Sequence, residues 1–252
     1  MSRKNPLLKK SVDVFIATTV IMAFWYFLAI YVKNNMLPTP WAAMREFMSI
    51  FRSTILQHFY ISGLRVVVSL LASTVIAVPL GLFLGREDKY DRYVSPVIYL
   101  LYPIPKIVFL PIVFLLFGLG NFPKIFMIGL IVFFQILVTT RDASKGVPVQ
   151  NIYSMLSLGA SRFQIYRHAV WPACLPKILT SLRISLGTAI AVLFFVESFA
   201  TSEGLGYFIM DSWSTASYSQ MFAGIMGMSF LGLILYIVLD IIESRWCKWQ
   251  YL

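Results

Sequence analysis

The chain has 252 residues, of which 59% are hydrophobic and only 13% are charged, and its mean hydropathy is +0.78. A soluble domain is about 45–50% apolar and about 25% charged, so this composition excludes an ordinary water-soluble globular protein. The net charge is +10, but the basic residues lie between apolar runs and form no patch with interleaved aromatic residues, which argues against nucleic-acid binding.

Apolar runs long enough to cross a bilayer predict an all-α, polytopic membrane protein with about six transmembrane helices. In chain order the runs are 12–32, 61–85, 93–117, 125–140, 179–199 and 222–242. We expect 1–252 to be a single transmembrane domain, in which 1–60 holds the first span and an outer segment and 61–242 forms a core of five spans. The first run lacks a small-x-small cleavage site, which favours an uncleaved span over a signal peptide.

The distribution of basic residues predicts the orientation. Most of the 21 Lys and Arg residues fall on one side of the predicted spans. Because cytoplasmic loops carry the excess of basic residues, we expect both termini to be cytoplasmic. Cys174 and Cys247 then face the cytoplasm, where no disulfide is expected.

Residues 38–60 form a predicted outer segment. Its apolar residues have helical spacing: Trp41, Met44, Met48, Phe51 and Ile55. This pattern predicts an amphipathic helix along the outer membrane boundary, or a packing strut without a ligand role.

The loop 141–178 is long for a connection between two spans, and we expect it to be structured and cytoplasmic. Ser161, with Gln164 three residues later, predicts a helix start closed by a capping box. Pro172 and Pro176 are expected to break the chain before the fifth span. Such a loop is where a cytoplasmic partner would dock.

Ionisable residues inside predicted spans are costly and usually pair or line a cavity. Arg65 and Glu197 would lie at similar depth and could pair, either as a structural ion pair or as part of a gate. Lys106 follows Pro103 and Pro105, which predict a break in the third span. This break could border a path for an anionic solute, or it could be a structural kink with Lys106 paired or snorkelling.

The histidines and the missing phosphate-binding loop argue against enzymatic chemistry, and one pair of glycines has two possible interpretations. His58 and His168 lie far apart with no cysteine or carboxylate cluster, so neither a metal site nor a catalytic residue is predicted. The chain has no phosphate-binding loop and no Gly-Lys pair, so it is expected to bind no ATP and no other cofactor. Gly81 and Gly85 suggest either close helix packing or a turn.

Residues 157–187 resemble the cytoplasmic coupling loop of the permease subunits of bacterial ATP-binding-cassette (ABC) importers. Residues 102–120 and 197–209 resemble the family's third span and the segment after its fifth span. The family's Glu-Ala-Ala falls here on Tyr153, Ser154 and Met155, so the acidic residue is absent. The coupling-loop residues that carry the resemblance are Ser157, Leu158, Gly159, Ala160, Ser161, Arg162, Gln164, Pro172 and Pro176.

The resemblance, which is to the nitrate, sulfonate and taurine branch, implies the type I ABC importer permease fold. It implies a multi-pass inner-membrane protein in contact with lipid, with ATP and Mg²⁺ used by separate cytoplasmic ATPase subunits. It also implies a periplasmic or lipoprotein solute-binding protein, and a homodimer is favoured over pairing with a second permease. Gly159 would let the loop approach the ATPase closely, although a turn glycine is the alternative.

The implied solute is a small organic anion such as an alkanesulfonate or taurine, or nitrate. A pyrimidine-like vitamin precursor is an alternative solute for the same permease role. An alternative from a different class is a secondary transporter that works alone, which internal inverted repeats or two broken helices would favour.

Overall fold

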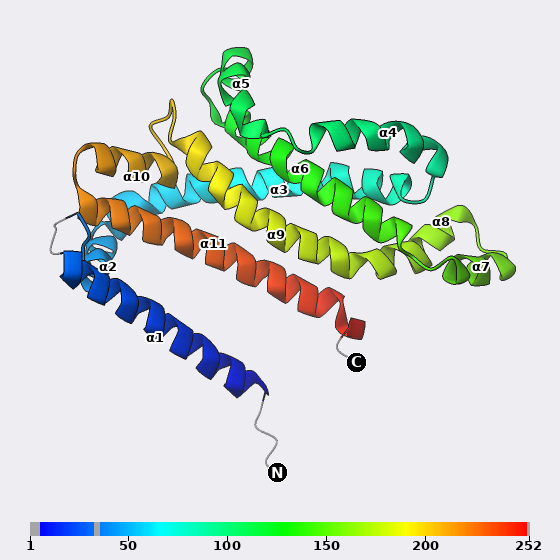
Figure 1. Cartoon of the computed structure of the whole chain (residues 1–252), viewed down its shortest axis with the longest axis horizontal. Helices are drawn as coiled ribbons and strands as arrows, with labels where there is room; N and C mark the ends of the chain where they lie inside the picture. The colour runs from blue at the N-terminus through cyan, green and yellow to red at the C-terminus, as the bar shows by residue number, and fades with distance from the viewer. Residues whose placement is uncertain (1–5, 33–35, 251–252) are drawn as a thin grey trace, which may run out of the picture.

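The computed structural model describes residues 6–32 and 36–250, and for residues 6–15 and 250 only the backbone is considered. Within these ranges every regular element is helical (Figure 1), which confirms the predicted fold class. The long helices are α1 (Pro6–Val32), α3 (Leu56–Leu84), α6 (Asn121–Lys145), α9 (Trp171–Glu197) and α11 (Tyr218–Trp246). The shorter helices are α2 (Pro40–Ile50), α4 (Asp88–Leu101), α5 (Leu110–Phe117), α7 (Val149–Ser157), α8 (Arg162–Ile165) and α10 (Leu205–Ser214).

The described residues contain four continuous helical stretches long and apolar enough to cross a membrane: Pro40–Leu84, Asn121–Lys145, Arg162–Glu197 and Tyr218–Trp246. A fifth span results if α4 and the stretch Lys106–Phe117 count as one bent element. α1 adds a shorter apolar stretch, Ile16–Val32. Each of the predicted apolar runs therefore corresponds to a helix or a helix pair.

The core is built where α3 packs along α6 and α6 packs along α9 (Figure 1). Small residues let the α3 and α6 backbones come close: a Cβ added to Gly81 would lie 2.8 Å from Thr140 Cβ, and one added to Gly85 would overlap the α6 backbone. Ser73 Oγ donates to the Gly129 carbonyl at 2.8 Å. The helix-packing interpretation of the paired glycines is thus confirmed, as expected for small-residue contacts between membrane helices. Gly85 is also the C-cap of α3, which agrees with the turn alternative.

The third span is not the straight helix drawn over residues 93–117. α4 ends at Leu101, and the chain resumes as a 3-10 turn, Lys106–Phe109, and then α5, with a bend of 79° between the two halves. Pro103 and Pro105 supply no backbone N–H, so the helical hydrogen-bond ladder cannot continue through them. The predicted break is confirmed, and the two halves meet at nearly a right angle.

Pro172 and Pro176 do not break the chain, and that prediction is wrong. Both lie inside α9, Pro172 in its first turn and Pro176 one turn later. The helix is continuous from Arg162 to Glu197 through a π-helical turn, Tyr166–Val170. The π-helical turn already interrupts the usual hydrogen-bond ladder directly before Pro172, so the missing N–H group of Pro172 is accommodated there.

The outer segment is not separate from the second span, which corrects the predicted boundary at residue 60. Thr39 caps α2, a π-helical turn Phe51–Ile55 follows, and the helix runs on into α3 as one stretch of 45 residues. The predicted apolar face is only partly buried. Trp41 and Met48 are 75% and 65% exposed, whereas Phe47, outside the predicted set, is buried against Phe230 of α11 at 5.4 Å between ring centroids.

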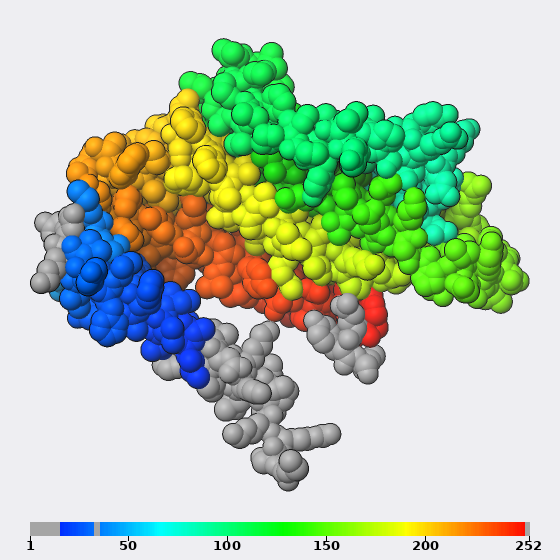
Figure 2. Space-filling model, viewed as in Figure 1, coloured from blue at the N-terminus to red at the C-terminus, as the bar shows by residue number. Residues whose placement is uncertain are grey.

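Different short helices lie at the two ends of the molecule (Figure 1). α2 and α10 lie at one end, and α7 and α8 lie at the other. α1 lies beside the first end and leaves much of α11 uncovered (Figure 2). Trp25 of α1 stacks on Phe222 of α11 at 5.5 Å, and a cavity of about 480 Å³ lies between these two helices.

Candidate functional site

The turn between α7 and α8 carries the coupling-loop residues. α7 ends at Ser157, and Gly159 adopts φ +74°, a left-handed conformation that favours glycine. Ala160 N–H donates back to the Met155 carbonyl at 3.1 Å, which closes the helix end. The turn-glycine alternative therefore describes the backbone of Gly159. A Cβ at Gly159 would meet no atom of the described chain within 4 Å, so its outer side is open to a partner.

Ser161 and Gln164 form the predicted capping box. Ser161 Oγ accepts from the Gln164 N–H at 3.4 Å, and Gln164 Oε1 accepts from the Ser161 N–H at 2.7 Å. Reciprocal bonds of this kind satisfy N–H groups that the first helical turn cannot pair internally. The capping box was predicted from two residues three positions apart, and the hydrogen bonds between them confirm it.

The turn presents large apolar side chains to the outside. Leu158 is 83% exposed and Phe163 is 71% exposed, while Ile152 and Ile165 are buried and anchor the turn from the inner side. Tyr153 is also exposed. Exposed apolar clusters rimmed by polar residues mark binding surfaces. Together Tyr153, Leu158 and Phe163 form what we call the apolar tip, at the α7–α8 end of the molecule (Figure 1).

Arg162 connects this turn to the rest of the chain. Its guanidinium lies 3.7 Å from the Glu87 carboxylate in the connection between α3 and α4. Arg162 is 89% exposed, so the ion pair contributes little stability by itself. The short distance between the two side chains shows that the coupling turn lies beside the α3–α4 connection. This connection leads into α4 and from there to the α4–α5 break.

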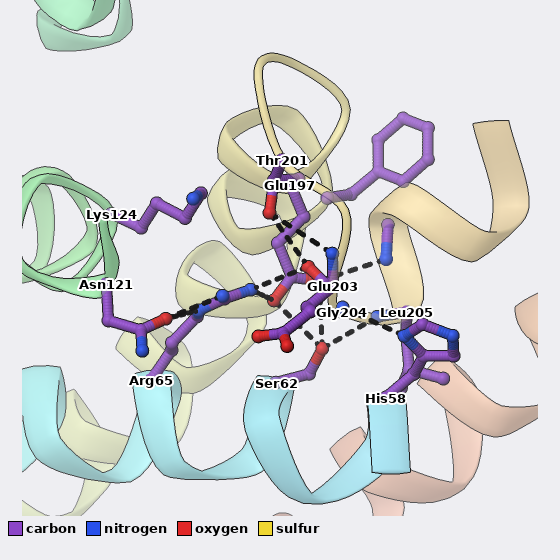
Figure 3. Close-up of polar contacts among 12 residues, drawn as sticks. His58, Ser62, Arg65, Asn121, Lys124, Glu197, Thr201, Glu203, Gly204 and Leu205 are labelled. Atoms are coloured by element: carbon purple, nitrogen blue, oxygen red, sulfur yellow. Dashed lines mark hydrogen bonds and ion pairs between the residues drawn. The ribbon is translucent and has the colours of Figure 1, made fainter. Parts of the chain in front are cut away.

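Arg65 and Glu197 pair as predicted, at the opposite end of the membrane-spanning core. The Arg65 Nη1 to Glu197 Oε1 distance is 2.6 Å, and the side chains are only 2% and 0% exposed (Figure 3). Arg65 comes from α3 and Glu197 is the last residue of α9. Removing two charges from water is costly unless further hydrogen bonds complete their coordination.

Other residues complete that coordination, and sequence reasoning missed them. Ser62 Oγ donates to the Glu197 carboxylate at 2.8 Å, and Asn121 Oδ1 accepts from Arg65 Nη2 at 2.6 Å (Figure 3). Ser62 lies one helical turn before Arg65 on the same face of α3, a spacing that could have revealed it. Asn121 belongs to α6, and nothing in the sequence indicates that it meets Arg65.

The segment after α9 folds around the buried carboxylate. The Gly206 N–H donates to Glu197 Oε2 at 2.9 Å, and the Leu205 N–H donates to Ser62 Oγ at 2.8 Å. Gly204 has φ +113°, and a Cβ there would overlap the Glu197 carboxyl group. The first N–H groups of α10 are therefore paired with side chains of α3 and α9, and a glycine is required where the chain crosses the carboxylate.

The α4–α5 break carries Lys106 as predicted. Its Nζ donates to the carbonyls of Leu101 and Tyr102 at 3.1 and 3.3 Å and lies 4.6 Å from the centroid of the Phe134 ring. Pro103, Pro105 and Lys106 border a cavity of about 340 Å³. Within the described residues Lys106 contacts neither Arg65 nor Glu197, so the predicted path residues form two separate groups.

Further buried cations went unnoticed in the sequence. Lys124 is 1% exposed, and its Nζ donates to the carbonyls of Leu119 and Gly120 at 2.9 and 3.2 Å. At the α7–α8 end, the Arg141 guanidinium of α6 forms an ion pair with Asp91 of α4. The Arg141–Asp91 pair joins two helices through residues that are 50 positions apart in the sequence, which no local pattern reveals.

Comparison with known proteins agrees with this architecture. Residues 77–248 match the model of the family described as binding-protein-dependent transport system inner membrane component. The chain is 28% identical to the taurine transport system permease protein of Escherichia coli, over 96% of this chain and 92% of that protein. It is 33% identical to an ABC transporter permease protein of Methanocaldococcus jannaschii, over 91% and 88% of the two chains. The nitrate import permease protein of Synechocystis is 24% identical over 96% and 93%.

A solved structure shares the fold. The MetNI methionine ABC transporter in an inward-facing conformation superimposes with a TM-score of 0.66 at 21% identity, covering 76% of this chain and 95% of that chain. The likeness establishes the type I ABC importer permease fold. With the family match over most of the sequence, it leads to one conclusion: this chain is a multi-pass inner-membrane protein that belongs to the binding-protein-dependent transport system inner membrane components, the permease subunits of ABC importers.

Proposed function

We propose that two copies of this chain enclose the solute path of an ATP-driven importer, with both termini cytoplasmic. Separate ATPase subunits, which bind ATP and Mg²⁺, dock on the cytoplasmic side, and a solute-binding protein delivers solute from outside. The family match supports a permease role, and the absence of a phosphate-binding loop from the sequence supports ATP hydrolysis by a partner.

The observation that carries the proposal is the apolar tip on a rigid turn. The turn is held by the capping box and by the left-handed Gly159, while the side chains of Leu158 and Phe163 are largely exposed. An exposed apolar knob on a fixed backbone suits a groove on a partner protein. The ATPase-coupling residues are accordingly Ser157, Leu158, Gly159, Ala160, Ser161, Arg162 and Gln164.

Pro172 and Pro176 do not break the chain but belong to the helix that joins the coupling turn to Glu197. They lie in the first two turns of α9, which is the last part of the continuous helical stretch Arg162–Glu197 that begins at the coupling turn. A continuous helix moves as a unit, so a displacement of the apolar tip would reach the Arg65–Glu197 pair at the far end. We assign Arg65 and Glu197 to an outer gate and Pro103, Pro105 and Lys106 to the solute path.

The relatives point to the class of solute. Their printed names refer to taurine, aliphatic sulfonates and nitrate, which share a small anionic group of oxygen atoms. A formylaminopyrimidine permease is also similar, at 26% identity. Lys106 at the α4–α5 break favours the anion, because a buried or half-buried cation is stabilised by an opposite charge.

The test is co-purification of the ATPase with this chain. The chain is expressed with the ATPase and binding protein encoded beside it, and a tagged wild type is compared with Phe163→Asp. Trp213→Asp on α10, at the opposite end of the molecule (Figure 1), is the matched control because it adds the same charge at an exposed aromatic residue away from the tip. We expect the ATPase to be retained by the wild type and the control and lost from Phe163→Asp. If no ATPase accompanies the wild type, the proposal is wrong.

A further inference from the structure

The connection between α9 and α10 crosses the buried ion pair of the proposed outer gate, and we call its residues 198–204 the gate loop. Two hydrogen bonds tie this loop to α3 (Figure 3). The Glu203 carbonyl accepts from Arg65 Nη1 at 3.0 Å. The Gly204 N–H donates to His58 Nδ1 at 3.1 Å. Because the two bonds come from neighbouring loop residues, they fix the end of the loop against α3.

The gate loop itself contributes little to holding this position. Ala200 has φ +50°, a left-handed conformation that is unfavourable for a residue with a Cβ. Phe199 is 58% exposed, and Ser202 is also exposed. The loop therefore depends on its hydrogen bonds to α3 more than on the packing of its own side chains.

Only one of these two hydrogen bonds depends on pH. A guanidinium group stays charged, so Arg65 remains a donor to the loop. His58 Nδ1 accepts a hydrogen bond, which requires a neutral ring that carries its proton on Nε2. A second proton would turn Nδ1 into a donor that faces the Gly204 N–H, and two donors cannot bond to each other. Gly204 is buried, so its N–H would lose its acceptor without gaining water.

The surroundings of His58 act on its charge from several sides. The ring is half-buried and stacks on Phe208 of α10, with 5.6 Å between the ring centroids. The charged groups that act on it come from three elements: Glu203 of the gate loop, Asp211 of α10 and Arg65 of α3. The Glu197 carboxylate of α9 is already paired with Arg65. Burial and Arg65 oppose a positive charge on the ring, whereas the other two carboxylates favour it, so neither protonation state is excluded.

We propose that His58 is a pH-dependent latch on the gate loop: the neutral ring holds Gly204 against α3, and protonation releases the loop from the outer gate. This inference rests on the proposed importer function, whose orientation places His58 at the outer face of the membrane. Gly206, two residues after the latch, donates to the Glu197 carboxylate. Release of the loop in acid would therefore loosen the coordination of the gate carboxylate.

The experiment measures the mobility of the gate loop in the whole chain, purified in detergent. A nitroxide spin label is attached to Ser202→Cys at neutral pH. Ser202 is exposed, whereas the native Cys174 and Cys247 are buried, so the label reacts with the loop. Electron paramagnetic resonance spectra are recorded from about pH 8 to about pH 5, the range in which histidine changes its charge. A label on Ser49→Cys of α2, at the same end of the molecule, controls for general effects of acid (Figure 1).

Three further changes are compared in the Ser202→Cys chain. His58→Gln removes the titrating ring, and His58→Lys places a permanent cation at the same position. The chain has two histidines, so His168→Gln is the matched control. His168 is exposed and lies in the π-helical turn that follows α8, at the opposite end of the molecule.

We expect acid to raise the ratio of mobile to immobilised label on the gate loop roughly threefold to tenfold, which corresponds to the loss of one hydrogen bond. His168→Gln should show the same rise. His58→Gln should show no dependence on pH, and His58→Lys should give a mobile loop throughout. The label on Ser49→Cys should not respond.

Two results would overturn the latch. One is a gate loop that keeps its mobility in acid, or that still responds to acid in His58→Gln. The other is a response that disappears in His168→Gln, which would assign the proton to the opposite end of the molecule. The measurement needs neither ATPase nor solute. A loop that responds as expected in a chain that retains no ATPase would support the latch while the importer function fails.

Discussion

At the scale of single residues, the buried pair of Arg65 and Glu197 shows how a membrane protein keeps charges inside. The pair is closed off from solvent and completed by Ser62, Asn121 and the N–H of Gly206. A buried ion pair contributes little net stability, but removing one partner leaves the other charge uncompensated and costs about 3–5 kcal/mol. The sequence predicted the pair only because both residues would lie at a similar depth in the predicted spans. The three groups that support the pair could be identified only from the folded structure.

Glu197→Gln is therefore expected to lower the thermal stability of the purified chain substantially, since Arg65 then lacks a counter-charge. Arg65→Gln combined with Glu197→Gln should be less destabilising than the sum of the two single changes, because the double variant leaves no unpaired charge. The melting temperature of the four proteins in detergent measures this coupling. Strictly additive losses would contradict a direct interaction.

Gly204→Ala should destabilise the chain more than Gly118→Ala. Both glycines have positive φ, at +113° and +76°, so both substitutions introduce backbone strain. A Cβ at Gly204 would also overlap the Glu197 carboxyl group, whereas one at Gly118 would meet nothing within 4 Å. The two melting temperatures provide the measurement. Equal losses would mean that the contact with Glu197 does not require a glycine.

At the scale of helices and turns, the sequence predicted correctly those features that depend on residues only a few positions apart. The capping box at Ser161 and Gln164 involves residues three apart, and the break at Pro103 and Pro105 follows from missing N–H groups. The same rule failed for Pro172, because the π-helical turn before it changes the hydrogen-bond ladder. A π-helical turn has no sequence signal that we used.

Ser161→Ala removes the side-chain acceptor of the capping box, which costs a helix start about 0.5–2 kcal/mol. We expect the α8 turn to loosen, so that ATP is hydrolysed with less solute transported per ATP. Ser161→Asp keeps an acceptor at the cap and should remain coupled. The ratio of uptake to phosphate release in liposomes tests this, and an unchanged ratio in Ser161→Ala would argue against a mechanical role for the turn.

At the scale of the whole molecule, α8 and α10 lie at opposite ends (Figure 1), so the proposed orientation places them on opposite sides of the membrane. Phe163 on α8 and Trp213 on α10 are both exposed, while the native Cys174 and Cys247 are buried. We expect a membrane-impermeant thiol reagent to label Trp213→Cys in intact cells. In cells that lack the ATPase proposed to cover this residue, Phe163→Cys should react only after permeabilisation, and the reverse pattern would invert the topology.

The sequence by itself determined the membrane class, the positions of the apolar spans, the α4–α5 break and the capped coupling turn. These features depend on hydropathy and on contacts between residues three or four apart, which can be read along the chain. Only the tertiary structure decided which polar groups meet: Asn121 with Arg65, Asp91 with Arg141, and the α10 N-terminus with Glu197. Such contacts depend on how α3, α6 and α9 pack, and the packing depends on small residues and helix phase, which hydropathy does not encode.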